Sequence, residues 1–305
     1  MDEKHEKSSE SIDGNPEGYT NTDNIRQDVD EVDALQVVSA DSPDYNMSQD
    51  KRGYAIIFKQ QKYNRNGPKE RNCASYDANE CSKTFKTLGF EVHEYSDLTK
   101  QEFLNTLDDI SEWQHENCDS LAVIFMSHGT YENKEEYIWL KDDKVPTSKL
   151  WNCFTPDKCM QLAGKPKMFF IQACRGVEAE KVINLKTDSV DSVKQEDDYT
   201  IPFHSDMLIM WASYPEMVSF RRKTDEKYTI KGSVFLHFLC QVLARDYAME
   251  DLYSMLLTVT RNVAIQYTSE IDDKRLDNKK QMPYTVSTLM RKVFFGKNQD
   301  AVNNV

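Results

Sequence analysis

The chain has 305 residues, and its 51 acidic against 38 basic side chains give a formal net charge of −13. The acidity is uneven: residues 1–50 hold 14 acidic and 3 basic side chains, residues 177–200 hold 7 and 3, and the rest is close to neutral. A body without a basic face is not expected to bind nucleic acid. The longest apolar runs have six residues, whereas a membrane-spanning helix needs about 20, so no membrane association is expected either.

The seven cysteines show no CxxC spacing, and the acidic, polar N-terminus does not resemble a secretory signal. Thiols in this pattern are typical of a reducing compartment and argue against a disulfide framework. We therefore expect a cytoplasmic protein.

Residues 1–50 are poor in aromatic residues and rich in Ser, Asp, Asn and Glu, which predicts a disordered segment, with order beginning at Arg52. From there, short apolar runs alternate with stretches of helical periodicity. Strands are predicted at 54–58, 90–95, 121–126, 168–173, 207–212 and 285–295, and helices at 77–87, 99–116, 233–248 and 250–268. The alternation predicts an α/β fold with a mostly parallel sheet, in which sites form beyond the carboxyl ends of the strands.

Two of the predicted buried strands end in residues suited to nucleophilic chemistry. The strand at 121–126 runs into Ser127-His128-Gly129, and the strand at 168–173 runs into Cys174-Arg175-Gly176. If these strands are neighbours, a thiol and an imidazole meet at one edge of the sheet, as nucleophile and proton carrier. Buried cysteines and hydrogen-bonded histidines are also common without such chemistry, so the spacing alone leaves an enzyme and a structural role equally open.

The residues around the two strand ends resemble those of the caspase family. The sequence QACRG at 172–176 matches the family's nucleophile signature, and the histidine motif lies upstream of it. Residues 51–58 (KRGYAIIF) resemble the family's first strand and residues 162–167 (LAGKPK) the lead-in to its fourth, so the resemblance extends over residues 51–296. It implies a three-layer α/β sandwich with a six-stranded, mostly parallel sheet and helices on both faces.

The activity that the resemblance implies is that of a cysteine endopeptidase, which cleaves proteins after Asp and needs neither a cofactor nor a metal. Cys174 would be the nucleophile and His128 the proton carrier, with the backbone N–H groups of Gly129 and Cys174 holding the oxyanion. The sequence offers no firm candidate for a third catalytic side chain.

The resemblance also implies the pocket for the substrate aspartate, which in the family is formed by two arginines and the glutamine of the nucleophile motif. These positions fall on Arg71, Gln172 and Arg221, and Arg221 ends the motif Ser219-Phe220-Arg221.

Several positions near this pocket depart from the family pattern. Cys73 stands where the family has a glycine, which adds a Cβ to a turn. Val218, Arg222 and Val234 also differ. We expect an ordinary S1 pocket and remodelled S2 to S4 pockets.

By the same resemblance, the chain divides into an acidic prodomain (1–50), a large subunit (51–188), an acidic linker (177–200) and a small subunit (201–305). The tetrapeptide Asp30-Glu31-Val32-Asp33 is the one that effector caspases prefer, so Asp33 is a predicted cleavage site. Asp188 and Asp191 each precede a serine in the linker, and the sequence does not choose between them. The short prodomain resembles that of effector-type members, including those of invertebrates, which are zymogens activated in trans.

The partners implied are protein substrates with Asp at P1, an upstream initiator caspase and inhibitor-of-apoptosis proteins. A second copy is also implied, since the family forms a homodimer of large–small subunit pairs through the last strand. The role would be to execute or regulate apoptosis. One alternative is a catalytically weak, caspase-like regulator of an active caspase. Another is a metal module built from His115, Cys118, Cys153 and Cys159, whose irregular spacing argues against it.

Overall fold

A six-stranded sheet forms the centre of the computed structural model, which describes residues 38–175, 204–222 and 230–296. The strands stand in the order β11-β8-β7-β3-β1-β2, with β11 antiparallel to β8 and all other neighbours parallel. Their bounds are β1 (Lys51–Lys59), β2 (Glu91–Ser96), β3 (Cys118–Met126), β7 (Lys167–Gln172), β8 (Met207–Trp211) and β11 (Tyr284–Ser287). The predicted, mostly parallel six-stranded sheet is confirmed.

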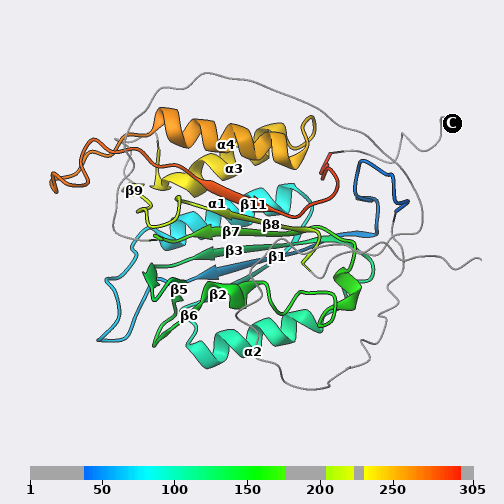
Figure 1. Ribbon diagram of the computed structural model, residues 1–305, viewed down its shortest axis with the longest axis horizontal. Helices are drawn as coiled ribbons and strands as arrows, with labels where there is room; N and C mark the ends of the chain where they lie inside the picture. Colours follow the sequence, from blue (N-terminus) through cyan, green and yellow to red (C-terminus); the bar gives the residue numbers. More distant parts are fainter. Residues whose placement is uncertain (1–37, 176–203, 223–229, 297–305) are drawn as a thin grey trace, which may run out of the picture. The chain divides into compact units, whose positions relative to one another are not determined.

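Helices cover both faces of this sheet (Figure 1). Helices α1 (Ala74–Thr87), α3 (Val234–Asp246) and α4 (Leu252–Gln266) lie on one face, and α2 (Lys100–Ser111) lies on the other. Successive strand residues point to opposite faces, so Ile57 and Ile124 pack in the core on the side of α1, whereas Ile56 and Val123 pack on the side of α2. The three-layer sandwich is therefore confirmed.

The helices form where apolar residues recur at helical spacing. Ala78, Cys81 and Phe85 on α1 are each at most 1% exposed, which is the face that the spacing predicts. Helix α2 begins at a capping box, in which the Thr99 side chain accepts from the Glu102 backbone and the Glu102 carboxylate accepts from Thr99.

Helix α2 ends at Ser111, five residues before the predicted end. Beyond it, the His115 ring turns inward, and its Nε2 lies 2.8 Å from the carbonyl oxygen of Ile110 in the last turn. Trp113 packs edge-on against Tyr54. Both side chains are therefore packed against the body beyond the end of the helix, so the apolar pattern continues after the helix has stopped.

Strand β11 is also shorter than the predicted strand at 285–295, because it ends at Ser287. The Thr288 hydroxyl donates to the carbonyl oxygen of His204 over 2.5 Å, and the chain then leaves the sheet edge. Val293 and Phe295 are buried in the core beside α1, α3 and α4, which explains their apolar character without a strand.

A small three-stranded sheet that the sequence did not predict follows His128. It consists of β4 (Gly129–Glu132), β5 (Glu135–Trp139) and β6 (Lys144–Pro146). Asn133 and Lys134 join the first two strands with positive φ values of 52° and 66°, the pattern of a type I′ hairpin turn. A second hairpin pairs β9 (Arg221–Arg222) with β10 (Gly232–Ser233), and short 3₁₀ turns lie at Thr147–Leu150 and Met160–Leu162.

Ordered structure begins before Arg52, where the sequence placed its start. Residues 38–50, here called the N-terminal strap, pack along the body, with Tyr45 and Met47 buried. The Tyr45 hydroxyl donates to Asp206 over 2.6 Å, and the Tyr45 N–H donates to the carbonyl oxygen of Lys292 over 2.9 Å. The expectation of disorder over 1–50 is therefore wrong for this part, because two apolar side chains anchor an otherwise polar segment.

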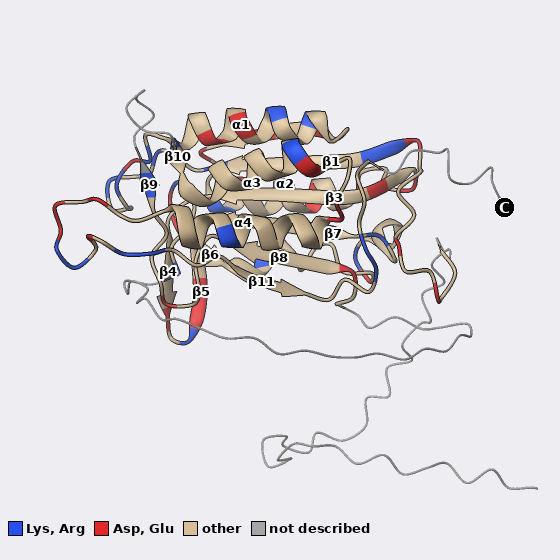
Figure 2. Ribbon diagram, turned by 90° about the horizontal axis from the view of Figure 1, so that it is seen from above, with Lys and Arg blue, Asp and Glu red and all other residues tan. Residues whose placement is uncertain are grey.

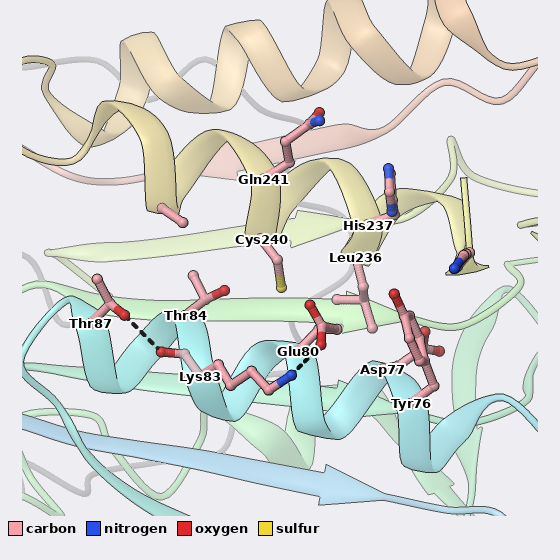
Figure 3. Close-up of a pocket in the computed structure, with 12 residues that line it drawn as sticks. Tyr76, Asp77, Glu80, Lys83, Thr84, Thr87, Leu236, His237, Cys240 and Gln241 are labelled. Atoms are coloured by element: carbon pink, nitrogen blue, oxygen red, sulfur yellow. Dashed lines mark hydrogen bonds and ion pairs between the residues drawn. The ribbon is translucent and has the colours of Figure 1, made fainter. Parts of the chain in front are cut away.

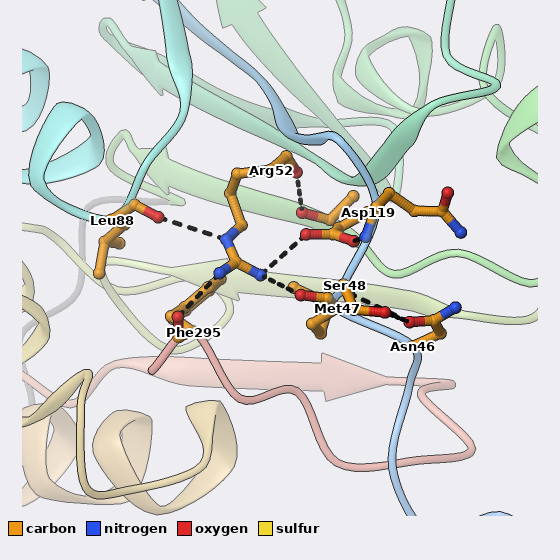
Figure 4. Close-up of polar contacts among 9 residues, drawn as sticks. Asn46, Met47, Ser48, Arg52, Leu88, Asp119 and Phe295 are labelled. Carbon is orange, nitrogen blue, oxygen red and sulfur yellow. Dashed lines mark hydrogen bonds and ion pairs between the residues drawn. The ribbon is translucent and has the colours of Figure 1, made fainter. Parts of the chain in front are cut away.

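Arg52 joins the strap to the rest of the body (Figure 4). Its guanidinium donates to the carbonyl oxygens of Met47, Leu88 and Phe295 over 3.2, 3.3 and 2.8 Å, and to the Asp119 carboxylate over 2.9 Å. One side chain thus ties four separate segments together.

Basic and acidic residues both occur along the described elements, and several basic segments lie beside β9 and β10 (Figure 2). Within the described residues, no helix combines the length and the apolar character that crossing a membrane requires.

Candidate active site

The two strand ends singled out in the sequence lie side by side. Strands β3 and β7 pair in parallel, with Met126 opposite Gln172, and the Ser127 N–H donates to the carbonyl oxygen of Gln172 over 3.1 Å. Gly129, which follows β3 and His128, lies so close to the segment after β7 that a Cβ on it would be 2.2 Å from the carbonyl oxygen of Cys174. The prediction that the histidine and cysteine motifs meet at one sheet edge is confirmed.

Backbone and tyrosine contacts orient His128. Its Nε2 lies 2.8 Å from the carbonyl oxygen of Lys69, and its backbone N–H donates to the Tyr63 hydroxyl over 3.3 Å. The Tyr63 hydroxyl is also 2.9 Å from the Ser127 hydroxyl. Because a carbonyl oxygen can only accept, Nε2 carries the ring proton, and the neutral ring presents the lone pair of Nδ1.

The imidazole of His128 is held in its neutral form. Burial lowers its pKa from 6.5 to about 4; the hydrogen bond to Lys69 opposes the shift, and the charges of Arg221 and Arg71 reinforce it. Burial disfavours the charged form, and two nearby cations disfavour it further. The ring is therefore unprotonated, in its base form, at neutral pH.

Ser219 bridges the cysteine and the glutamine of the nucleophile motif. Its N–H lies 3.4 Å and its hydroxyl 3.5 Å from Cys174 Sγ, and the hydroxyl accepts a 3.0 Å hydrogen bond from Gln172 Nε2. Gln172 is buried, and its Oε1 has no partner among the described residues. The segment before β9 is thus held directly against the thiol.

The two arginines predicted for substrate binding lie near this edge in different environments. Arg71 is 1% exposed, and its Nη1 donates to the carbonyl oxygen of Gln60 over 3.4 Å. No carboxylate of the described residues forms an ion pair with it. Arg221 is exposed, and both charges act on His128.

Two neighbours of these arginines fit their positions without strain. Cys73 has φ −87° and ψ −7° as the N-cap of α1, so the Cβ that replaces the family's glycine meets an ordinary backbone conformation. Phe220 is buried, its ring centroid is 5.5 Å from that of Tyr267, and its N–H donates to Gln281 over 2.7 Å.

Arg175, which follows Cys174, is buried and holds the loop of the cysteine in place. Its Nε donates to Glu136 of β5 over 2.6 Å, and its guanidinium lies 4.3 Å from the ring centroid of Trp211 and 5.2 Å from that of Tyr284. The side chain therefore connects the cysteine loop to the small sheet and to β8 and β11.

Sequence reasoning missed Tyr63, Lys69 and the contact of Ser219 with the thiol. The Lys69 contribution is a backbone carbonyl, which no residue type reveals, and Tyr63 is an isolated aromatic in a polar loop. Asp33, Asp188 and Asp191 lie outside the described residues.

The residues considered for a metal module do not gather. Cys118 Sγ contacts the carbonyl oxygen of Gln114, and the His115 ring faces Ile110. Among the described residues, no three His, Cys, Asp or Glu side chains converge as a metal site would require.

A thiol and a neutral imidazole at adjacent ends of parallel strands, with two guanidinium groups nearby, define a cysteine hydrolase of the α/β class. Comparison with known proteins narrows this class. The family model described as "Caspase domain" matches residues 52–295.

Individual relatives agree. Caspase-1 of Spodoptera frugiperda is 34% identical over 267 residues, which cover 87% of this chain and 86% of that protein. Caspase-7 of Gallus gallus is 33% identical over 255 residues, covering 82% and 79%. The crystal structure of the Spodoptera caspase-1 matches with a TM-score of 0.77 over 87% of this chain and 100% of that one. The chain belongs to the caspase family and is a cysteine-type endopeptidase.

Proposed function

We propose that this chain cleaves protein substrates after Asp, with Cys174 as the nucleophile and His128 as the proton carrier. The observation that carries the proposal is the state of His128: it is neutral, its tautomer is fixed by the Lys69 carbonyl, and it follows the strand next to that of Cys174.

The reaction follows from these positions. The Cys174 thiol passes its proton to Nδ1 of His128 as its sulfur attacks the carbonyl carbon of the substrate aspartate. The imidazolium then protonates the leaving amine as the C–N bond breaks, which leaves a thioester. Water, deprotonated by His128, attacks the thioester and releases the carboxylate product and the thiol. The backbone N–H groups of Gly129 and Cys174 stabilise the oxyanion.

Selection of aspartate is assigned to Arg71, Gln172 and Arg221, with Ser219 and Phe220 in the same segment as Arg221. Arg71 supports this role because it is buried and forms no ion pair with a described residue. A buried guanidinium without a carboxylate partner gains most from a substrate that brings one.

Activation is proposed to occur by cleavage at Asp188 or Asp191, with Asp33 as a further site in the prodomain. The cut would fall between β7, which ends at Gln172, and β8, which begins at Met207. An upstream initiator caspase would make it, and the mature form would be a homodimer of large–small pairs that meet along β11, an edge strand of the sheet. The enzyme would act in apoptosis in the cytoplasm, under the control of inhibitor-of-apoptosis proteins.

The test uses a peptide fluoromethyl ketone that ends in Asp, which alkylates a reactive thiol after binding as a substrate. Chain processed by an active caspase should be labelled at Cys174, on a fragment that ends at 188 or 191. The Cys174→Ala variant and a reagent ending in Asn instead of Asp serve as controls. Processed chain that stays unlabelled would instead support the regulator without catalytic activity.

A further inference from the structure

Asp77 is a buried acidic residue to which the proposed mechanism assigns no task. It lies in the first turn of α1, six positions after Arg71, and is 2% exposed. Figure 3 shows it beside Tyr76 at the start of α1, across from the first turns of α3, which carry Leu236 and His237. Burying a carboxylate costs free energy unless it is hydrogen-bonded or paired with a cation, so the groups that contact Asp77 indicate why it is buried here.

Both carboxylate oxygens of Asp77 accept hydrogen bonds from Ser233, and the Cys73 side chain also bonds to this carboxylate. Oδ1 accepts from the Ser233 N–H over 2.9 Å, and Oδ2 accepts from the Ser233 hydroxyl over 2.5 Å. Ser233 is the N-cap residue of α3, yet its side chain makes no capping hydrogen bond to that helix. A serine at an N-cap normally bonds the helix backbone, so here the link to Asp77 takes precedence over the cap.

The backbone before Ser233 is shaped to let the carboxylate approach. Gly232 has a φ of +67°, and a Cβ on it would lie 2.1 Å from Asp77 Oδ1. Any other residue would therefore both strain the backbone and collide with the carboxylate.

Ser233 is in turn paired with the second arginine of the proposed substrate pocket. In the β9–β10 hairpin, Ser233 stands opposite Arg221. Asp77, whose carboxylate binds Ser233, lies six residues after Arg71 in the chain. The charge of Arg71 also acts on Asp77, where it and the Ser233 bonds oppose the rise in pKa that burial causes.

We infer that Asp77 is a positioning residue for recognition of the substrate aspartate. Asp77 accepts hydrogen bonds from Ser233 with both carboxylate oxygens, and these bonds hold the β9–β10 hairpin, which carries Arg221, in place relative to the segment that carries Arg71. The two guanidinium groups can then bind the same carboxylate, that of the substrate aspartate. If the chain is cut between β7 and β8, this link joins the large and the small subunit. The inference rests on the proposed function.

The experiment compares full-length chains after processing, using a fluorogenic peptide with Asp at P1 and its Asn counterpart. We expect Asp77→Ala to raise KM for the Asp peptide about 10- to 100-fold, as expected when bonds to a charged group are lost, and to reduce the preference for Asp over Asn by a similar factor. Ser233→Ala keeps the N–H bond and should have a smaller effect in the same direction. Alkylation of Cys174 by iodoacetamide, which needs no substrate pocket, should keep its rate.

Asp77→Asn is the conservative variant. Its amide oxygen can accept from the Ser233 N–H and its amide nitrogen can donate to the Ser233 hydroxyl, so it should restore most of the KM and the selectivity. Glu80→Gln is the matched control, because it removes one charge from the same helix at an exposed pair with Lys83, and it should behave like the wild type.

The outcomes separate the two hypotheses. A wild-type chain that does not cleave after Asp overturns the proposed function. If the wild type cleaves while Asp77→Ala and Ser233→Ala leave KM and selectivity unchanged, or lower the alkylation of Cys174 as much as the cleavage, the positioning role is wrong. An Asp77→Asn variant as impaired as Asp77→Ala also contradicts it.

Discussion

Replacement of Arg52 by methionine should destabilise the fold strongly, because the side chain holds four segments and neutralises a buried carboxylate. The Arg52 and Asp119 side chains are 15% and 2% exposed, and their charged groups are 2.9 Å apart. Without the arginine, Asp119 keeps the 2.8 Å hydrogen bond from the Gln49 N–H and the weaker influence of the Lys165 charge, but loses the cation that is paired with it. Breaking a buried pair costs about 3–5 kcal/mol, and the partial exposure of Arg52 favours the lower end, about 3 kcal/mol.

The free energy of unfolding is best measured by urea denaturation in a Cys174→Ala background, which keeps the chain from cutting itself. A loss of about 3 kcal/mol corresponds to a fall in Tm of roughly 6–12 °C for a domain of this size. Asp119→Asn in the Arg52→Met background removes the unpaired charge, so we expect it to recover about 1–2 kcal/mol.

Lys51→Met is the neighbouring control. Lys51 pairs with Glu91 at 3.7 Å, with both side chains more than half exposed, and such surface pairs contribute about 0–1 kcal/mol. A loss of less than about 1 kcal/mol for Arg52→Met, or a loss no larger than that of Lys51→Met, would refute this role of Arg52.

Two further predictions concern the proposed active site. The ring protons of His128 should show neutral imidazole by NMR at pH 6 and titrate near pH 4, since burial lowers the pKa to about 4; titration at about 6.5 would show that the ring is solvated. Gly129→Ala should lower kcat roughly 100-fold and lower Tm by several degrees, because the new Cβ would lie 2.2 Å from the carbonyl oxygen of Cys174 and displace the nucleophile. Unchanged turnover of the Asp peptide would refute that contact.

The sequence predicted the central sheet and the helices well, because buried parallel strands are continuous apolar runs and the helices have one clear apolar face. The small sheet at 129–146 was missed because its strands are rich in Glu and Lys and its turn is Asn133-Lys134, without the glycine that usually marks a hairpin. The predicted end of α2 lies too far along the chain because Trp113, which extends the apolar pattern, packs against Tyr54 from outside the helix.

At the site, the sequence predicted the side chains but not the support that orients them. His128 and Cys174 follow from motifs at strand ends, whereas the Lys69 carbonyl and the Ser233 backbone act through groups that every residue carries. Their positions are set by how loops fold back onto the sheet, and local pattern does not reveal such contacts. Whether the turn at Cys73 accepts a Cβ likewise depends on its φ, which residue type alone does not determine.

The N-terminal strap has a consequence for what proteolysis can separate. Tyr45 and Arg52 stand on one side of any cut between β7 and β8, and their partners Asp206 and Phe295 stand on the other. A cut after Asp33 would leave residues 38–50 attached to the large piece. These contacts would therefore still join the two pieces after a cut between β7 and β8. Its two pieces should migrate together in native gels and part only when denatured.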